Sequence, residues 1–104
     1  VEDCVAVALW LLEHGPRQGG LFNVGTGEAR SFADLARAVF AALGRPENIR
    51  YRPMPEELRE KYQYFTEARI ERLRAAGYDR PFRSLEEGVR RYLQDFLMRE
   101  DRYR

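Results

Sequence analysis

The sequence contains few of the residues from which active sites and metal centres are often built. Its 104 residues include one cysteine, one histidine and one lysine, which are Cys4, His14 and Lys61. A single cysteine excludes an internal disulfide, and Cys4 with His14 is too small a set for a zinc site that needs several such ligands. The formal net charge is only +1, so no strong overall field favours nucleic acid or a membrane surface as a partner.

Long apolar segments are also missing. No run of about 18 apolar residues is present and no signal-peptide pattern is found, so we expect a cytoplasmic protein without a membrane span. The length suits one domain or a piece of one. Because Val1 is not methionine and a helical pattern begins almost at once, we interpret the chain as part of a longer one.

The spacing of apolar residues predicts an α/β fold with about four helices and two to three short strands. The predicted helices open after the capping residues Asp3, Ser31, Thr66 and Ser84. Phe32 is assigned to the apolar stripe of the second helix, which Gly44 ends, and Gly77 ends the third. A short helical turn is expected over 56–60. The predicted strands and extended segment are residues 21–24, 49–54 and 62–65.

The sequence Gly25-Thr26-Gly27 follows a predicted strand and precedes a helix, which is where phosphate-binding loops occur. A dinucleotide fingerprint has the form G-x-G-x-x-G, and Arg30 stands where its third glycine would be. We therefore favour a structural interpretation, a turn in which one glycine needs a positive φ. No cofactor-binding residue is assigned.

A short-chain dehydrogenase uses the pair Tyr-x-x-x-Lys, in which the lysine lowers the pKa of the tyrosine. The only lysine is Lys61 and the residue four positions before it is Glu57, so this catalytic pair is absent. His14 is interpreted as a capping or surface residue, and Cys4 as a small buried apolar residue. No catalytic residue and no metal ligand are therefore assigned.

Residues 61–65 combine a cation, aromatic rings and an amide in an extended stretch. Such a strip can line a sugar or nucleotide site, with rings covering apolar faces and polar groups binding hydroxyls or phosphate. It can equally be a buried strand whose Tyr64 and Phe65 serve as core. Under the first interpretation the candidate substrate-binding residues are Tyr62 and Gln63.

Three stretches resemble one enzyme family. Lys61-Tyr62-Gln63-Tyr64-Phe65-Thr66 is similar to a basic-Tyr-Gln-x-Phe-Thr strip in the C-terminal third of the ADP-L-glycero-D-manno-heptose 6-epimerases, which are extended short-chain dehydrogenases/reductases. The segment Leu73–Asp79, followed by a basic residue and Pro-Phe, is nearly as specific. Phe22-Asn23-x-Gly25-Thr26-Gly27 is shared more widely among sugar-nucleotide epimerases and dehydratases.

This resemblance implies an isomerase that interconverts ADP-D-glycero- and ADP-L-glycero-D-manno-heptose for the inner core of lipopolysaccharide. It implies an ADP-sugar substrate, NADP as cofactor and a homo-oligomeric parent enzyme. Tyr62 stands where the family's tyrosine contacts substrate. The cofactor loop and the Tyr/Lys pair of the family would lie before Val1, so the chain alone is expected to be inactive.

The resemblance also implies that residues 1–104 form one incomplete unit, the C-terminal substrate-binding region. Residues 31–60 and 82–100 would belong to the substrate lobe, while 1–30 and 61–80 would pack on the cofactor domain, at the edge of its Rossmann fold. Two alternatives stay open: a part of another nucleotide-sugar epimerase or dehydratase, and a stand-alone protein-interaction module.

Overall fold

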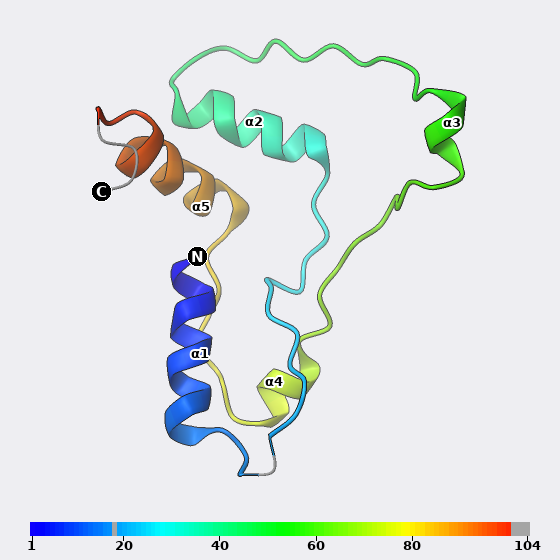
Figure 1. Cartoon of the computed structure of the whole chain (residues 1–104). Helices are drawn as coiled ribbons and strands as arrows, with labels where there is room; N and C mark the ends of the chain where they lie inside the picture. Colours follow the sequence, from blue (N-terminus) through cyan, green and yellow to red (C-terminus); the bar gives the residue numbers. More distant parts are fainter. Residues whose placement is uncertain (18, 101–104) are drawn as a thin grey trace. The chain divides into compact units, whose positions relative to one another are not determined.

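The computed structural model describes residues 1–17 and 19–100, and all regular structure in them is helical (Figure 1). The helical elements are α1 (Glu2–His14), α2 (Phe32–Ala42), α3 (Glu56–Arg59), α4 (Glu71–Ala75), α5 (Leu85–Tyr92) and the π-helical segment η1 (Leu93–Leu97). None of the described residues forms a strand, so the predicted α/β class is wrong. The three segments predicted as extended or as strands, 21–24, 49–54 and 62–65, are irregular. A strand exists only when its backbone groups pair with a neighbour, and none of these segments pairs with another described one.

The chain divides into two compact units that alternate along the sequence. The first unit contains Val1–Ala29 and Glu67–Arg83, and so includes α1 and α4. The second contains Arg30–Thr66 and the described residues from Ser84 onward, and so includes α2, α3, α5 and η1. Each unit is described separately below.

The core of the first unit is small and lies between α1 and the segment around α4. Val7, Leu73 and Tyr78 are its buried residues. Trp10 meets Tyr78 edge to face, with ring centroids 5.5 Å apart. The guanidinium of Arg74 lies over the Tyr78 ring and donates hydrogen bonds to the carbonyls of Tyr78 (2.8 Å) and Arg80 (2.7 Å), which fixes the turn after α4. The unit is therefore held by a few large side chains rather than by a sheet.

Two predicted helix starts in the first unit are wrong. The N-cap of α1 is Val1, and no side chain caps that end. The carboxylate of Asp3 instead accepts a hydrogen bond from the backbone N–H of Arg83 at 2.9 Å. Similarly, α4 begins at Glu71 instead of after Thr66. The residues before it are irregular, and in this segment the Glu67 carboxylate accepts a hydrogen bond from the N–H of Ala29 at 3.1 Å.

The second unit is organised by α2, which packs against α5 and η1. Ser31 caps α2 through a complete capping box: its hydroxyl accepts from the Asp34 N–H at 3.0 Å, and the Asp34 carboxylate accepts from the Ser31 N–H at 3.1 Å. The hydroxyl of Ser84 caps α5 in the same manner by accepting from the Glu87 N–H. The predicted caps of both helices are confirmed. Gly44 follows α2 with a φ of 64°, as expected of a glycine that ends a helix.

Candidate functional site: an exposed aromatic cluster

Three aromatic side chains of the second unit meet around Tyr62, and we call Phe32, Tyr62 and Tyr64 the aromatic cluster. The ring centroids of Tyr62 and Phe32 are 6.5 Å apart with the planes inclined at 45°. Tyr62 and Tyr64 meet edge to face at 5.5 Å and 76°. Both separations lie in the range in which aromatic rings attract each other. The structure thus brings a residue of the predicted strip together with a ring thirty positions earlier.

The position of Phe32 follows from the local sequence. It is the first residue of α2 and stands directly after the Ser31 cap. Directly before the cap, the guanidinium of Arg30 hydrogen-bonds the Glu86 carboxylate at the start of α5, and it also contacts Asp34 at 3.5 Å. The backbone on both sides of Phe32 is therefore held by hydrogen bonds and ion pairs.

Tyr64 is positioned from the opposite direction. Its hydroxyl lies 3.9 Å from the sulfur of Met54, and the carbonyl of Met54 accepts a hydrogen bond of 3.2 Å from Nε of Arg59 in α3. These contacts connect the two ends of the loop that contains α3. They place Tyr64 beside Tyr62 although residues 62–70 have no regular structure.

The cluster is a surface and not a core in this chain. The exposed fractions are 75% for Phe32, 74% for Tyr64 and 38% for Tyr62, so Tyr62 is the most covered of the three. Phe65, at 70%, is also exposed. The interpretation of residues 62–65 as a buried strand is therefore wrong. Exposed rings of this kind can stack on the apolar face of a sugar or a base, and the phenol of Tyr62 can donate or accept a hydrogen bond.

The other residues of the strip add polar groups but no catalytic pair. Gln63 and Lys61 are both exposed. Within the described part of the chain, neither the Gln63 amide nor the Tyr62 hydroxyl has a hydrogen-bond partner, so both remain available to a ligand. The Tyr-x-x-x-Lys pair is absent by sequence, and the structure brings no tyrosine of the cluster into an ion pair or hydrogen bond with Lys61.

Charged groups next to the cluster are stabilised as ions. The hydrogen bond from Arg30 lowers the pKa of Glu86 below its ordinary value, and the same contact raises the pKa of Arg30. The hydrogen bond from the Ser31 backbone lowers the pKa of Asp34. These three groups are therefore charged at neutral pH, and their contacts stabilise the start of α2 rather than provide an acid or a base.

The glycine loop does not have the geometry of a phosphate site. Gly27 has a φ of 75°, which confirms the interpretation of a turn with one positive φ. A Cβ on Gly27 would lie 3.1 Å from Cδ1 of Ile70, and one on Gly25 would lie 2.7 Å from Cβ of Ala68. The space beside both glycines is thus occupied by the segment that precedes α4. The residues present do not fit a dinucleotide.

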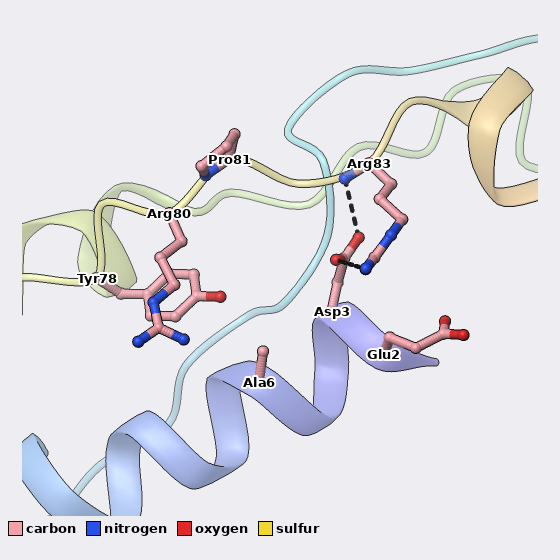
Figure 2. A pocket seen from close by; sticks show the side chains of 7 residues that line it. All are labelled: Glu2, Asp3, Ala6, Tyr78, Arg80, Pro81 and Arg83. Atoms are coloured by element: carbon pink, nitrogen blue, oxygen red, sulfur yellow. Dashed lines mark hydrogen bonds and ion pairs between the residues drawn. The ribbon is translucent and has the colours of Figure 1, made fainter.

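A shallow hollow of about 380 Å³ lies in the first unit (Figure 2). Figure 2 shows Asp3 paired with Arg83 at one side, while Arg80 and the hydroxyl of Tyr78 lie at the other. Glu2 also lines the hollow. The charged groups of the hollow include the ion pair in which Asp3 and Arg83 bind each other. We therefore interpret the hollow as the place where α1 is joined to the segment after α4, and not as an active site.

The remaining candidates from the sequence are surface residues. His14 is exposed and stacks on Trp10, with the ring centroids 5.7 Å apart, so its predicted surface position is confirmed. Cys4 is exposed, so the prediction that it is buried is wrong. Among the described residues, no group of three or more His, Cys, Asp or Glu side chains could hold a metal ion. No helix in the same residues is long and apolar enough to cross a membrane.

The contact between Phe32 and Tyr62 was not predicted from the sequence. The apolar spacing places Phe32 in the stripe of its helix, whereas in the structure its side chain is 75% exposed and its ring meets that of Tyr62. One local feature indicates that Phe32 is less covered than the rest of the stripe: it is the first residue of the helix, directly after the Ser31 cap. Which ring it would meet is not encoded in that spacing.

Comparison with known proteins shows a clear similarity over nearly the whole chain. ADP-L-glycero-D-manno-heptose-6-epimerase of Nitratidesulfovibrio vulgaris strain DP4 is 50% identical over 101 residues, which cover 97% of this chain and 31% of that protein. The protein of the same name from Fusobacterium nucleatum is 42% identical over 109 residues, which cover 99% of this chain and 32% of that protein. The one from Alkalilimnicola ehrlichii is 50% identical over 93 residues, covering 89% and 28%.

These comparisons confirm the resemblance on which the sequence interpretation depends. The chain spans about a third of the length of the curated relatives it matches. No protein-family model matches the chain.

Proposed function

We propose that this chain is the C-terminal substrate-binding part of a cytoplasmic ADP-L-glycero-D-manno-heptose 6-epimerase. The observation that carries the proposal is the identity of 50% over 97% of the chain to a protein of that name. The reaction would interconvert ADP-D-glycero- and ADP-L-glycero-D-manno-heptose, which are precursors of the lipopolysaccharide inner core. An identity this high over about a hundred residues favours this reaction over that of other sugar-nucleotide epimerases or dehydratases.

Within this function, Tyr62 and Gln63 would contact the ADP-sugar. The exposed rings around Tyr62 and the available amide of Gln63 support this assignment. A phenol and an amide side by side suit the hydroxyls and phosphates of a nucleotide sugar, because each can donate and accept hydrogen bonds. Because the chain has no Tyr-x-x-x-Lys pair, we assign both groups the role of binding and orienting the substrate.

NADP would be held by other parts of the enzyme. The glycine loop of this chain is packed against Ala68 and Ile70, and it has Arg30 where a fingerprint has its third glycine. When bound, NADP supplies hydride transfer for an epimerase of this class. We therefore expect the 104-residue chain by itself to have no epimerase activity and no tight NADP site, and the parent enzyme to be a homo-oligomer.

The two units of the fold suggest how the residues divide between the parts of the enzyme. We propose that residues 31–60 and 82–100 belong to the substrate lobe and that 1–30 and 61–80 contact the cofactor domain. The alternation of the units supports this division, with boundaries at Ala29/Arg30, Thr66/Glu67 and Arg83/Ser84, except that residues 61–66 belong to the second unit. Tyr62 lies four residues before one of these boundaries.

The test uses the protein encoded by the complete open reading frame that contains these residues. Conversion of ADP-D-glycero-D-manno-heptose is followed in the wild type and in Tyr62→Phe. Loss of one hydrogen bond to the substrate weakens binding by about 0.5–1.5 kcal/mol, and by more if the partner is a phosphate, so KM should rise roughly two- to tenfold. The dissociation constant of NADP should change less.

Tyr51→Phe is the matched control. Tyr51 is 77% exposed in the same unit and has no ring contact with another described residue, so its hydroxyl should be dispensable. A wild-type protein without turnover of ADP-heptose would contradict the proposed function. Unchanged KM and kcat in Tyr62→Phe, with an active wild type, would contradict only the contact role of Tyr62.

A further inference from the structure

We propose that Phe32 is a positioning residue for Tyr62: its ring, fixed at the start of α2, holds the Tyr62 phenol in the orientation that meets substrate. The proposal rests on the proposed function, because Tyr62 has a substrate to meet only in such an enzyme. It assigns a task to a residue outside the strip that the resemblance marks.

The first step is that Tyr62 needs support from side chains. It lies between the end of α3 at Arg59 and the start of α4 at Glu71, in a segment without regular structure. No helix or sheet therefore holds its backbone. Among the described residues, the aromatic contacts of its side chain are those with the rings of Phe32 and Tyr64.

The second step is that Phe32 is the better anchored of these two rings. It follows the capping box of Ser31 and Asp34, whose two hydrogen bonds measure 3.0 and 3.1 Å. Arg30, which precedes the capping residue Ser31, is paired with Glu86 of α5. Tyr64, in contrast, belongs to the same irregular segment as Tyr62, and its hydroxyl lies 3.9 Å from the sulfur of Met54. The fixed reference for Tyr62 is therefore the start of α2.

The third step concerns the hydroxyl. The rings of Phe32 and Tyr62 are 6.5 Å apart and inclined at 45°, which is an attractive geometry that restricts rotation of the Tyr62 ring. The Tyr62 hydroxyl has no hydrogen bond to another described residue. Its direction is thus set by how the ring is held. A phenol held in advance loses less conformational entropy when a ligand binds.

The fourth step separates this role from a role in folding. Phe32 is 75% exposed in this 104-residue chain, so truncating it removes little of the surface that these residues bury among themselves. The capping box is formed by backbone groups and by the side chains of Ser31 and Asp34, so it does not depend on the ring. We therefore expect Phe32→Ala to keep the wild-type melting temperature. Phe32→Leu removes the ring but keeps an apolar side chain, so it is the second variant if Phe32→Ala folds poorly.

The experiment compares Phe32→Ala, Tyr62→Phe and the double variant in the complete protein. Phe32→Ala should raise KM for ADP-heptose roughly two- to tenfold with little change in kcat. This is the fold-change that corresponds to losing the attraction of one aromatic pair. Phe32→Tyr, which retains a ring, should restore the wild-type KM. In the Tyr62→Phe background, Phe32→Ala should have little further effect, because no hydroxyl remains to be positioned. Tyr51→Ala is the control for loss of an exposed ring.

A second measurement does not depend on activity. 3-Fluorotyrosine is incorporated at position 62, and the fluorine resonance is recorded in the wild type and in Phe32→Leu. Removal of the neighbouring ring should shift and narrow the signal, as the ring current is lost and the Tyr62 ring turns more freely. Tyr51→Leu should leave the signal in place.

Three outcomes would overturn the proposal. These are an unchanged KM in Phe32→Ala, an effect of Phe32→Ala that adds in full to that of Tyr62→Phe, and a fluorine signal that Phe32→Leu does not move. Failure of the proposed function is distinguishable, because the wild-type protein would then not convert ADP-heptose at all. Normal wild-type turnover with any of the three results overturns the positioning role alone.

Discussion

Asp3 and Arg83 are joined in the first unit although 80 positions separate them in the sequence. The Asp3 carboxylate accepts hydrogen bonds from both the backbone N–H and the guanidinium of Arg83. Both side chains are partly covered, with exposed fractions of 27% for Asp3 and 32% for Arg83. This pair connects the start of α1 to the end of the segment that follows α4.

We expect Asp3→Ala to destabilise the protein by about 1.5–3 kcal/mol, the range for hydrogen bonds to charged groups. The free energy of unfolding in urea checks this. Glu13→Ala is the control at the other end of α1, where the Glu13 side chain is 70% exposed and its carboxylate lies 3.8 Å from Nδ1 of His14. Equal effects of the two substitutions would contradict a specific role of the Asp3–Arg83 pair.

Acid should weaken the contacts at the start of α2. The pKa values of Asp34 and Glu86 are lowered, by the Ser31 backbone and by Arg30 respectively. A carboxyl with a lowered pKa stabilises the folded state above its ordinary pKa, and this contribution is lost as the pH falls through the lowered value. The melting temperature should therefore decrease below about pH 4. An Asp34→Asn/Glu86→Gln variant with an equally steep decrease would argue against these two groups.

Leu73 and Leu12 provide a matched pair for the core of the first unit. Leu73 is fully buried, whereas Leu12 in α1 is 84% exposed. Leu73→Ala should cost about 2–5 kcal/mol because it leaves a cavity, and Leu12→Ala should stay within about 0.5 kcal/mol. Urea unfolding of the two variants tests whether the small core carries the stability of the unit. A small effect at Leu73 would show that it does not.

Gly27 and Gly44 both have positive φ angles, 75° and 64°, but different surroundings. A Cβ on Gly44 would meet nothing within 4 Å, whereas one on Gly27 would press on Ile70. Gly44→Ala should therefore cost only the backbone strain of about 1–2 kcal/mol, and Gly27→Ala should cost more. The difference in melting temperature between the two variants measures how much the contact between position 27 and Ile70 costs beyond the backbone strain. Identical values would mean that Ile70 moves freely.

The exposed face of α1 should make the isolated 104-residue chain self-associate. Val5, Leu9 and Leu12 lie on one face of the helix, with exposed fractions of 50%, 57% and 84%. Contiguous apolar surface of this kind favours association. Analytical ultracentrifugation should show dimers or larger species, which Leu9→Glu should reduce. A stable, cooperatively melting monomer would contradict this prediction and favour a stand-alone interaction module.

Local features of the structure were predictable from the sequence because each depends on residues a few positions apart. Ser31 and Ser84 cap their helices by bonding the backbone three residues later, and Gly44 and Gly77 follow helices with positive φ. The resemblance to the heptose epimerases was also predictable, because it rests on short local motifs around Tyr62 and Leu73.

Contacts between distant segments were decided by the tertiary structure alone. Alternating apolar residues predicted strands, but a strand requires a partner, and the path of the chain provides none for 21–24 or 49–54 among the described residues. The Asp3 carboxylate binds the N–H of Arg83 instead of capping its own helix, and the ring of Phe32 contacts that of Tyr62, thirty positions later. Sequence by itself determined the helix caps, the turns and the family resemblance. Only the tertiary structure decided which side chains meet around Tyr62, because such a contact depends on the course of the whole intervening chain.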